Sequence, residues 1–296
     1  MKQLIIIALL LCVSIISRSQ FSNNEVITKE LGISLGAMNC NTDIGGQLAD
    51  MKSFKPSGGL YAAVLYRQKV GARLEATIGS VTASDARTMD YRLRNRNLDF
   101  TSVIKEISLL AEVHPLNFGA QQRGTPALSP YLLAGVGYFG FDPKTQLNGQ
   151  WIYLQPLHTE GEGFPETGRP NYRLSALNIP VGGGLQYNIS ERLIVRGEAV
   201  YRFLNTDYLD DVSTRYIDPN LFDKYLSADN AILAKRLADR SYNIAENGVR
   251  SPGSQRGSPK KDTYYSVNIK LGVRLAKDAS WGSGRVVKKA QGCFAF

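Results

Sequence analysis

The chain has 296 residues and a formal net charge of +9, from 35 lysine and arginine residues against 26 aspartate and glutamate residues. Its three cysteines are too few for a disulfide framework, and neither HExxH nor CxxC metal spacing occurs in the sequence. No nucleic-acid-binding motif accompanies the positive charge. We therefore expect the charge to reflect contact with anionic lipid or an acidic partner, and no nucleic acid as a partner.

Residues 1–19 have the features of a secretory signal peptide. Lys2 provides a positive start, residues 4–16 form a short apolar stretch, and residues 17–19 (SRS) form a small-x-small cleavage site before Gln20. The apolar stretch is shorter than the ~20 residues that a spanning helix needs, which argues against the alternative of an N-terminal membrane anchor. No later segment is continuously apolar, so a membrane location would require a β-barrel.

Alternation of apolar and polar residues predicts eight β-strands. The clearest is 264–276 (YYSVNIKLGVRLA), in which every second side chain is apolar and the intervening ones include Lys270 and Arg274. Pro180 interrupts the sixth strand, where we expect a bulge because proline cannot donate a ladder hydrogen bond. The predicted strands are 30–38, 58–67, 70–80, 100–114, 130–141, 173–188, 192–203 and 264–276.

The connections between these strands tend to alternate between long and short. Residues 68–69 and 189–191 are short turns and 115–129 is of medium length, whereas the long loops are 39–57, 81–99, 142–172 and 204–262. Short periplasmic turns and long extracellular loops are typical of outer-membrane barrels, and an even strand number returns the C-terminus to the periplasm. The predicted fold is therefore an all-β, eight-stranded antiparallel transmembrane barrel. The alternative is a soluble barrel or sandwich of lipocalin type, in which loops of about thirty residues would be unusual.

In the barrel interpretation, nine charged side chains share the inward faces of the strands. The interior of an eight-stranded barrel is just wide enough to be filled by side chains. We therefore expect these charges to form ion pairs that close the lumen, and the alternative of a conducting pore would need an open one. The nine residues are Arg73, Glu75, Glu106, Glu112, Arg196, Glu198, Arg202, Lys270 and Arg274.

We expect no catalytic, cofactor-binding or metal site. The two histidines are His114, expected at the periplasmic end of the fourth strand, and His158, expected in an outer loop beside Glu160 and Glu162. They should lie a membrane thickness apart and so could not share an acid–base or nucleophilic site. A weak cation site at His158 is the remaining alternative to a solvated loop.

Two further patterns concern the barrel's ends. Residues 221–240 carry apolar side chains at roughly helical spacing and predict an amphipathic helix in the last outer loop. Eight aromatic residues near strand ends fit interfacial aromatic girdles, although ordinary strand composition explains them as well. They are Tyr61, Tyr66, Tyr131, Tyr138, Tyr187, Tyr201, Phe203 and Tyr265.

Residues 20–276 thus form the predicted barrel, and residues 277–296 a basic periplasmic extension. Cys293 lies in this extension, while Cys40 follows the first strand on the opposite rim. A disulfide needs Cα atoms within ~7 Å, so we expect these two not to pair. In an oxidising compartment a leftover thiol favours intermolecular pairing, and we expect Cys293 to bond a periplasmic partner.

Five stretches of the sequence carry a resemblance to a known family. They are ELGISLGAMNC in the first strand, EISLLAEVHPLNF in the fourth, PYLLAGVGYFGFDP in the fifth, LNIPVGGGLQYNI in the sixth, and TDYLDDVSTRY after the seventh. With them the chain resembles the PorG-like outer-membrane barrels of Bacteroidetes, a component of the type IX secretion system. The resemblance extends over nearly the whole mature chain.

The resemblance implies a non-enzymatic barrel without cofactors. It implies association with a periplasmic ring formed by a lipoprotein and its partner protein, which the barrel helps to anchor to the outer membrane and its lipid. The alternative is a generic small barrel with a structural or adhesion role through its surface loops. Ring contact is implied for the turn 114–129 and the tail 277–296, with Arg123, Arg285, Lys288, Lys289 and Phe296 as docking residues.

Overall fold

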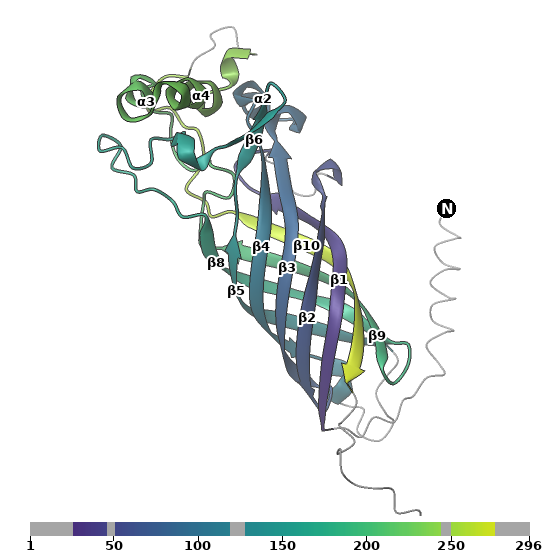
Figure 1. The fold of residues 1–296 in the computed structure, drawn as a ribbon. Coiled ribbons are helices and arrows are strands. Elements are labelled where there is room, and N and C mark those ends of the chain that lie inside the picture. The colour runs from purple at the N-terminus through teal and green to yellow at the C-terminus, as the bar shows by residue number, and fades with distance from the viewer. Residues whose placement is uncertain (1–25, 46–50, 119–127, 244–249, 276–296) are drawn as a thin grey trace, which may run out of the picture.

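The computed structural model describes residues 26–45, 51–118, 128–243 and 250–275. Eight long strands form a closed antiparallel barrel (Figure 1), as predicted. Each strand pairs with its neighbours along the chain, and β1 closes the barrel against β10. The strands are β1 Ile27–Asn41, β2 Lys55–Tyr66, β3 Val70–Ser84, β4 Asp99–Val113, β5 Leu128–Gly140, β8 Ser175–Asn188, β9 Leu193–Leu204 and β10 Thr263–Leu275.

The side chains of the barrel are apolar outside and charged inside. In β10, Ile269 is 68 % exposed on the outer face, whereas the next residue, Lys270, is fully buried in the interior. Outward leucine, isoleucine and valine side chains on the other strands, such as Leu60, Leu109 and Leu132, repeat this pattern. A soluble barrel would have the opposite arrangement, so the lipocalin-type alternative is wrong and the outer face is one that contacts lipid.

Among the residues that the structure describes, no helix is long and apolar enough to cross a membrane.

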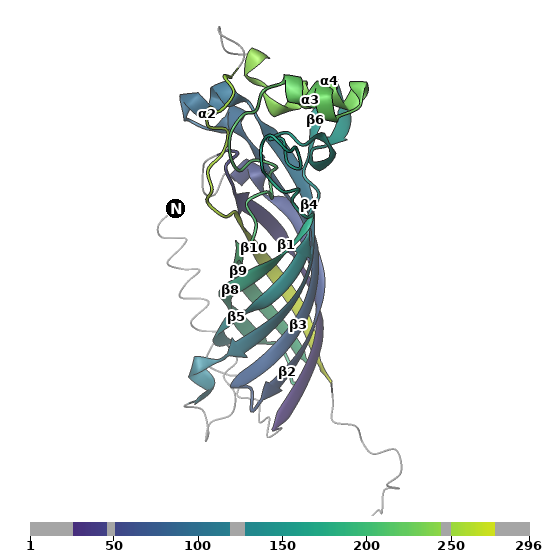
Figure 2. The same ribbon diagram turned by 90° about the vertical axis from the view of Figure 1, so that its left-hand side faces the viewer.

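The long connections gather at one end of the barrel (Figure 2). We call this end the long-loop rim and the opposite end the short-turn rim. The described parts of the four long connections, which we call the cap, are residues 42–45 with 51–54, 85–98, 141–174, and 205–243 with 250–262.

The main apolar core lies in the cap and the adjoining strand ends, because the barrel interior below it is charged. Strand residues such as Met38 and Phe100 pack in one cluster with Leu209, Val212 and Phe222 of the cap. Burying an aliphatic or aromatic side chain stabilises a fold by about 1.5–3 kcal/mol, so this cluster gives the cap its own source of stability. The cap is therefore a folded layer on top of the barrel.

The segment predicted as one loop, 81–99, is largely ordered secondary structure. Strand β3 extends past its predicted end to Ser84 because Val81 is buried in the core and Thr82 Oγ1 donates to the carbonyl oxygen of Phe100 at 2.7 Å, whereas β4 begins one residue before its predicted start. The remainder forms the 3-10 helix η2 (Asp85–Arg87) and the short helix α2 (Tyr91–Arg96).

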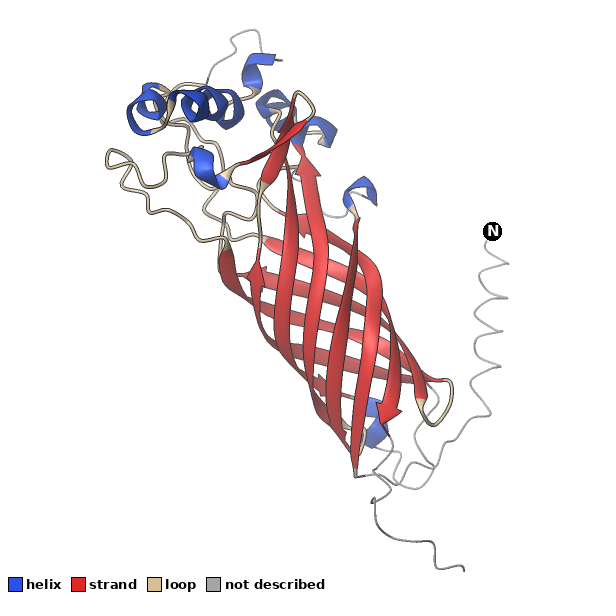
Figure 3. Ribbon diagram, in the orientation of Figure 1, coloured by secondary structure: helices blue, strands red, loops and turns tan. Residues whose placement is uncertain are grey.

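The long connection between β5 and β8 contains a hairpin that the prediction missed (Figure 3). Strands β6 (Lys144–Leu147) and β7 (Gln150–Tyr153) pair across Asn148 and Gly149, which both have positive φ, and η4 (Gln155–Leu157) follows. Asn-Gly between short alternating segments is a strong hairpin signal in a sequence.

The helix predicted over 221–240 is two helices. α3 (Asn220–Tyr225) ends before Leu226, and α4 (Ala228–Ala238) begins after Ser227, whose hydroxyl accepts a hydrogen bond from the backbone N–H of Asn230 at 3.5 Å. Serine at an N-cap satisfies a free N–H of the first turn and so starts a new helix there. The 3-10 helix η5 (Ser241–Asn243) follows α4.

The bulge predicted at Pro180 does not occur. Pairing of β8 with β5 is interrupted there, but the register on both sides is the same, with Ala134 opposite Val181 and Gly137 opposite Asn178. Proline removes one donor without inserting a residue, and Pro180 still lies opposite Arg202 of β9.

At the short-turn rim, the β2–β3 and β8–β9 connections are short turns, and the β4–β5 connection, residues 114–127, is longer. The β2–β3 turn is centred on Arg67 and Gln68, both at positive φ, one residue before the predicted position. The described part of the β4–β5 connection contains the 3-10 helix η3 (Pro115–Phe118). At the other rim, the 3-10 helix η1 (Met51–Ser53) precedes β2.

Two residues expected in an aromatic girdle, Tyr61 and Tyr131, are instead buried in the barrel interior.

Candidate functional site

A network of buried ion pairs fills the middle of the barrel. Arg73 of β3 is its centre: its guanidinium lies 2.8 Å from Glu112, 2.7 Å from Glu198 and 3.2 Å from Glu75. The Arg73 side chain is fully buried. Since an unpaired charge is very costly in such a place, three carboxylates around one arginine imply further cations nearby.

Two further cations balance these carboxylates. Arg196 lies 3.0 Å from Glu112 and is also paired with Glu30. The Lys270 ammonium lies 2.6 Å from Glu75 and 2.8 Å from Glu198. Every carboxylate in the centre therefore contacts a cation that comes from another strand.

The network continues toward both rims and is electrically balanced. Arg202 lies 2.7 Å from Glu106, and Arg274 lies 3.6 Å from Glu30. Among the described barrel residues, the buried charges are five cations and five carboxylates. All nine predicted lumen residues are buried in the barrel and ion-paired, and the prediction missed the tenth buried charge, Glu30. Gly32 and Ser34 belong to the inward face of the first predicted strand, and the same two-residue period, continued toward the N-terminus, places Glu30 on that face.

Aromatic rings fill space between the charges. The Tyr131 hydroxyl donates to Glu198 at 2.7 Å, and the Arg196 guanidinium lies 5.2 Å from the Tyr131 ring centre. Tyr61 has Arg73, Arg196 and Lys270 within 5.5–5.7 Å of its ring centre. Cations on aromatic faces are stabilised further when desolvated, so these rings both fill the interior and hold its charges.

A polar cluster closes the barrel interior near the short-turn rim. His114, which follows β4, has Nδ1 3.3 Å from Ser129 Oγ and stacks on Tyr131 at 5.2 Å. Ser129 donates to Asn117, and Asn117 donates to the backbone carbonyl of Gln68. The other histidine, His158, lies in the cap against Phe164. The histidines are thus at opposite ends of the molecule.

One segment of the cap, 206–216 (TDYLDDVSTRY), organises the other loops, and we call it the hub segment. Asp210 accepts a hydrogen bond from the backbone N–H of Ile44 at 3.0 Å. Asp211 accepts from the Thr159 hydroxyl and from the Tyr172 hydroxyl, both at 2.5 Å. The hub segment therefore joins the connection after β1 to the connection after β5.

Glu160 holds the hub segment from the other side. Its carboxylate accepts from the backbone N–H groups of Ser213 and Thr214 and from the Arg256 guanidinium at 3.1 Å. Arg256 also donates to the backbone carbonyl of Asp211 at 2.7 Å. Since both Glu160 and Arg256 are buried, this is a structural pair rather than an exposed one.

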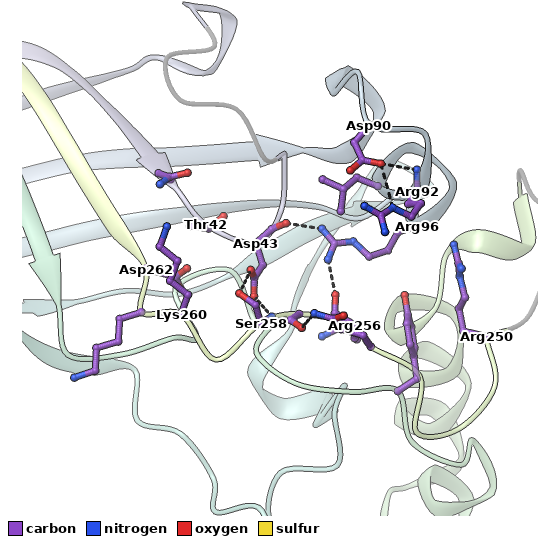
Figure 4. Close-up of a pocket in the computed structure, with 16 residues that line it drawn as sticks. Thr42, Asp43, Asp90, Arg92, Arg96, Arg250, Arg256, Ser258, Lys260 and Asp262 are labelled. Carbon is purple, nitrogen blue, oxygen red and sulfur yellow. Dashed lines mark hydrogen bonds and ion pairs between the residues drawn. The ribbon is translucent and has the colours of Figure 1, made fainter.

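Arg96 adds the connection between β3 and β4 to the same assembly. Its guanidinium is paired with Asp85 at 2.7 Å and donates to the backbone carbonyl oxygens of Asp43 and Arg256 (Figure 4). Arg96 therefore joins three of the four long connections. Sequence reasoning did not find it, because its RLRNRN segment looks like an ordinary charged loop.

Burial raises the pKa of several carboxyl groups in the cap. The pKa of Asp210 rises to about 7 and that of Glu162 to about 8, mainly because burial penalises the charged form and neighbouring carboxylates repel it. Burial also raises the pKa of Asp207 to about 7, and that of Asp211 to about 6 against the lowering effect of Arg256. These groups change charge near neutral pH.

A cavity of about 530 Å³ opens beside Arg96 and Arg256 (Figure 4). Its walls come from the connections after β1, β3 and β9. Six cationic side chains and three carboxylates line it, so its lining is positively charged. The charged lining residues are Arg92, Arg96, Arg250, Arg256, Lys260, Lys261, Asp43, Asp90 and Asp262.

The predicted docking residues and the predicted reactive cysteine lie outside the described residues. They are Arg123, Arg285, Lys288, Lys289, Cys293 and Phe296. The other predicted thiol, Cys40, is buried at the cap end of β1, with its sulfur 3.8 Å from the Thr82 carbonyl oxygen. The proposed signal peptide is likewise outside the described range.

A closed eight-stranded antiparallel barrel with an apolar outer face and an ion-paired interior defines an outer-membrane β-barrel. The chain belongs to the family described as domain of unknown function DUF6089, whose profile matches residues 2–218. No curated protein sequence matches the chain.

Several solved structures are similar to this chain. The N-terminal β-barrel domain of Pseudomonas aeruginosa OprF has 11 % identity and a TM-score of 0.32, over 83 % of this chain and 97 % of that one. Neisserial surface protein A has 7 % identity and a TM-score of 0.36, over 85 % and 98 %. The attachment invasion locus protein Ail of Yersinia pestis has 11 % identity and a TM-score of 0.36, over 84 % and 97 %.

Proposed function

We propose that this protein is a non-enzymatic outer-membrane component of the type IX protein secretion machinery. In this proposal the barrel anchors a periplasmic ring formed by a lipoprotein and its partner protein. The main supporting observation is the filled interior: Arg73, Arg196 and Lys270 are fully buried and ion-paired across the lumen. A barrel with such an interior acts through its two ends, which favours an anchoring role over conduction.

The proposed orientation places the short-turn rim in the periplasm and the cap outside the cell. Outer-membrane barrels have short periplasmic turns and long extracellular loops, and this chain's long connections gather at one rim. With eight strands, both ends of the chain are then periplasmic. This puts the basic tail, 277–296, on the side where the ring would lie.

The short-turn rim offers a surface suited to a protein partner. Leu116 and Phe118 of η3 are 58 % and 53 % exposed, and the Lys69 ammonium lies 5.5 Å from the Phe118 ring centre. Neighbouring exposed apolar side chains can mark a site of protein interaction, and aromatic residues such as Phe118 are enriched at interfaces. Together with the tail cations Arg285, Lys288 and Lys289, this rim is the proposed ring contact.

Deleting residues 277–296 tests the proposal. The barrel should still assemble in the outer membrane, while crosslinking and co-purification from membranes should lose the ring lipoprotein and secretion should fall. A matched control replaces the tail with a glycine–serine segment of equal length and should show the same loss. Normal secretion and normal ring association of the deleted form would contradict the anchoring role.

The second candidate is a small outer-membrane barrel with a structural or adhesion role through its surface loops. The folded cap and its cavity favour this candidate, because a purely anchoring barrel needs no ordered surface at the other end. In that case the tail deletion would secrete normally, and changes in the cap would reduce surface attachment.

A further inference from the structure

The cavity in the cap contains cations that the fold does not use. Arg96 and Arg256 line it, and the guanidinium groups of both already donate hydrogen bonds to carboxylates and backbone carbonyls of the cap. The Arg92 side chain is different: it is 89 % exposed and its nearest carboxylate, Asp90, is 3.8 Å away. Cations that do not stabilise the fold are available to a ligand.

Two further lining cations are equally available. Among the described residues, the side chains of Arg250 and Lys260 have no ion-pair partner. Lys261 also lines the cavity, and its ammonium donates to Asn205 at 2.6 Å. The wall therefore presents several cations without a close carboxylate partner, which favours an anionic ligand.

Tyr216 provides an independent indication of a ligand. It lines the cavity and is only 5 % exposed, yet within the described structure its hydroxyl has no hydrogen-bond partner. A buried hydroxyl without a partner is unfavourable, and a ligand group that reaches it through the wall of the cavity would satisfy it. Burial raises the pKa of Tyr216, which keeps the hydroxyl protonated and able to donate.

The rest of the lining suits a sugar. Asn41 and Gln255 supply amide groups that exchange hydrogen bonds with hydroxyls, and Asp90 supplies a carboxylate that accepts them. Leu93 and Tyr216 add apolar surface. The volume of about 530 Å³ lies in the range of small-molecule sites and far exceeds a single inorganic ion.

We propose that this cavity binds an anionic saccharide, meaning a sugar that carries a carboxylate or a phosphate. The exposed cations Arg92 and Lys260 and the half-buried Arg250 would attract the acidic group, and Tyr216 would donate to the sugar. The saccharide could belong to a glycolipid of the surrounding leaflet or arrive in solution, and the chemistry of recognition is the same. This inference is independent of the proposed secretion role, because it concerns the opposite rim.

Calorimetric titration of the full-length protein in detergent tests the proposal. The probes are digalacturonate and glucose 1-phosphate, with maltose and inorganic phosphate as comparisons. At least one acidic sugar should bind about tenfold more tightly than either comparison, and its affinity should fall with added salt. Failure of both acidic sugars to bind, or equal binding of inorganic phosphate, would overturn the proposal.

Variants then assign the binding to this cavity. Arg92→Gln with Lys260→Gln should weaken binding about tenfold, whereas Arg236→Gln, an exposed cation of α4 outside this cavity, should not change it. Tyr216→Phe should weaken binding about fivefold without lowering the thermal stability of the ligand-free protein. Equal affinities of the double variant and the Arg236→Gln control would place the binding elsewhere and reject the proposal.

A competition experiment separates the two sources of the saccharide. Purified lipopolysaccharide in nanodiscs that carry the protein is titrated against the acidic sugar that binds. Displacement of the sugar in the wild type, but not in the Arg92→Gln, Lys260→Gln variant, identifies a membrane glycolipid as the source. Undiminished binding of the soluble sugar identifies a ligand from solution. Both results retain the proposed chemistry.

Discussion

Lys270 of β10 lies 2.6 Å from Glu75 of β3, although β1 and β2 separate these strands around the barrel wall. The pair therefore spans the interior rather than joining neighbouring strands. Because both side chains are buried, the contact links two distant parts of the wall through a region from which water is excluded.

Replacing Lys270 by methionine should destabilise the barrel by about 3–5 kcal/mol, because Glu75 and Glu198 would each lose a buried cationic partner. Urea unfolding in lipid vesicles, read by the mobility of unheated samples on gels, measures this loss. Adding Glu75→Gln should restore part of the stability. The matched control is Lys105→Met, which changes an exposed, outward-facing lysine of β4. An equal loss of stability there would contradict the buried-pair explanation.

Tyr61 sets a limit on the size of the residues opposite it. A Cβ atom added to Gly272 would lie 2.2 Å from the Tyr61 hydroxyl oxygen and 2.8 Å from a side-chain carbon of Ile194. Gly272→Ala should therefore displace Tyr61 and destabilise the barrel by about 1–3 kcal/mol. Gly197→Ala in β9, where an added Cβ meets nothing within 4 Å, should have little effect in the same unfolding assay. Equal effects of the two changes would show that Tyr61 moves at no cost.

The cap should be more stable at acidic than at alkaline pH. The pKa values of Asp207 and Asp210 are about 7 in the fold, against about 4 in an unfolded chain, so between these values the folded cap binds more protons. The stability that this provides is complete below pH 4 and is lost as the pH rises through 7. Protease resistance of the cap should therefore be greater at pH 5.5 than at pH 8.5. Asp210→Asn should reduce the difference, and the opposite trend would contradict the raised pKa values.

Cys293 should form an intermolecular disulfide in cells. Non-reducing gels of whole membranes should show a larger species with the wild type and with Cys40→Ser, because Cys40 is buried at the cap end of β1. Cys293→Ser should lose that species. Identical migration of the wild type and Cys293→Ser would rule out the disulfide.

The barrel was predictable because its signals are local. Alternation in β10 separates Ile269 from Lys270 without knowledge of any other strand, and the same period places Arg73 and Arg196 inside. The ion-pair partner of each lumen charge was not predictable, because it depends on which strands face each other across the closed barrel, as β3 and β10 do. Tyr61 was misassigned for the same reason, since a tyrosine near a strand end fits either face.

The cap was the part that sequence reasoning described least well. The backbone N–H of Ile44 meets Asp210, which is 166 residues further along the chain, and Arg96 meets the backbone of Arg256, 160 residues further. No periodicity encodes such contacts. The Asn148–Gly149 pair is a local signal for the β6–β7 hairpin, but the prediction missed it because the surrounding segment has the composition of a loop.

The hub segment makes the structure of the cap depend on the closed barrel. It lies between β9 and β10, yet it bonds to Ile44 after β1 and to Glu160 after β5. These partners lie side by side only where the closed sheet brings the ends of β1, β5 and β9 to the same rim. The cap and the barrel therefore depend on each other, since a change that opened the sheet would also separate the connections that the hub segment holds together.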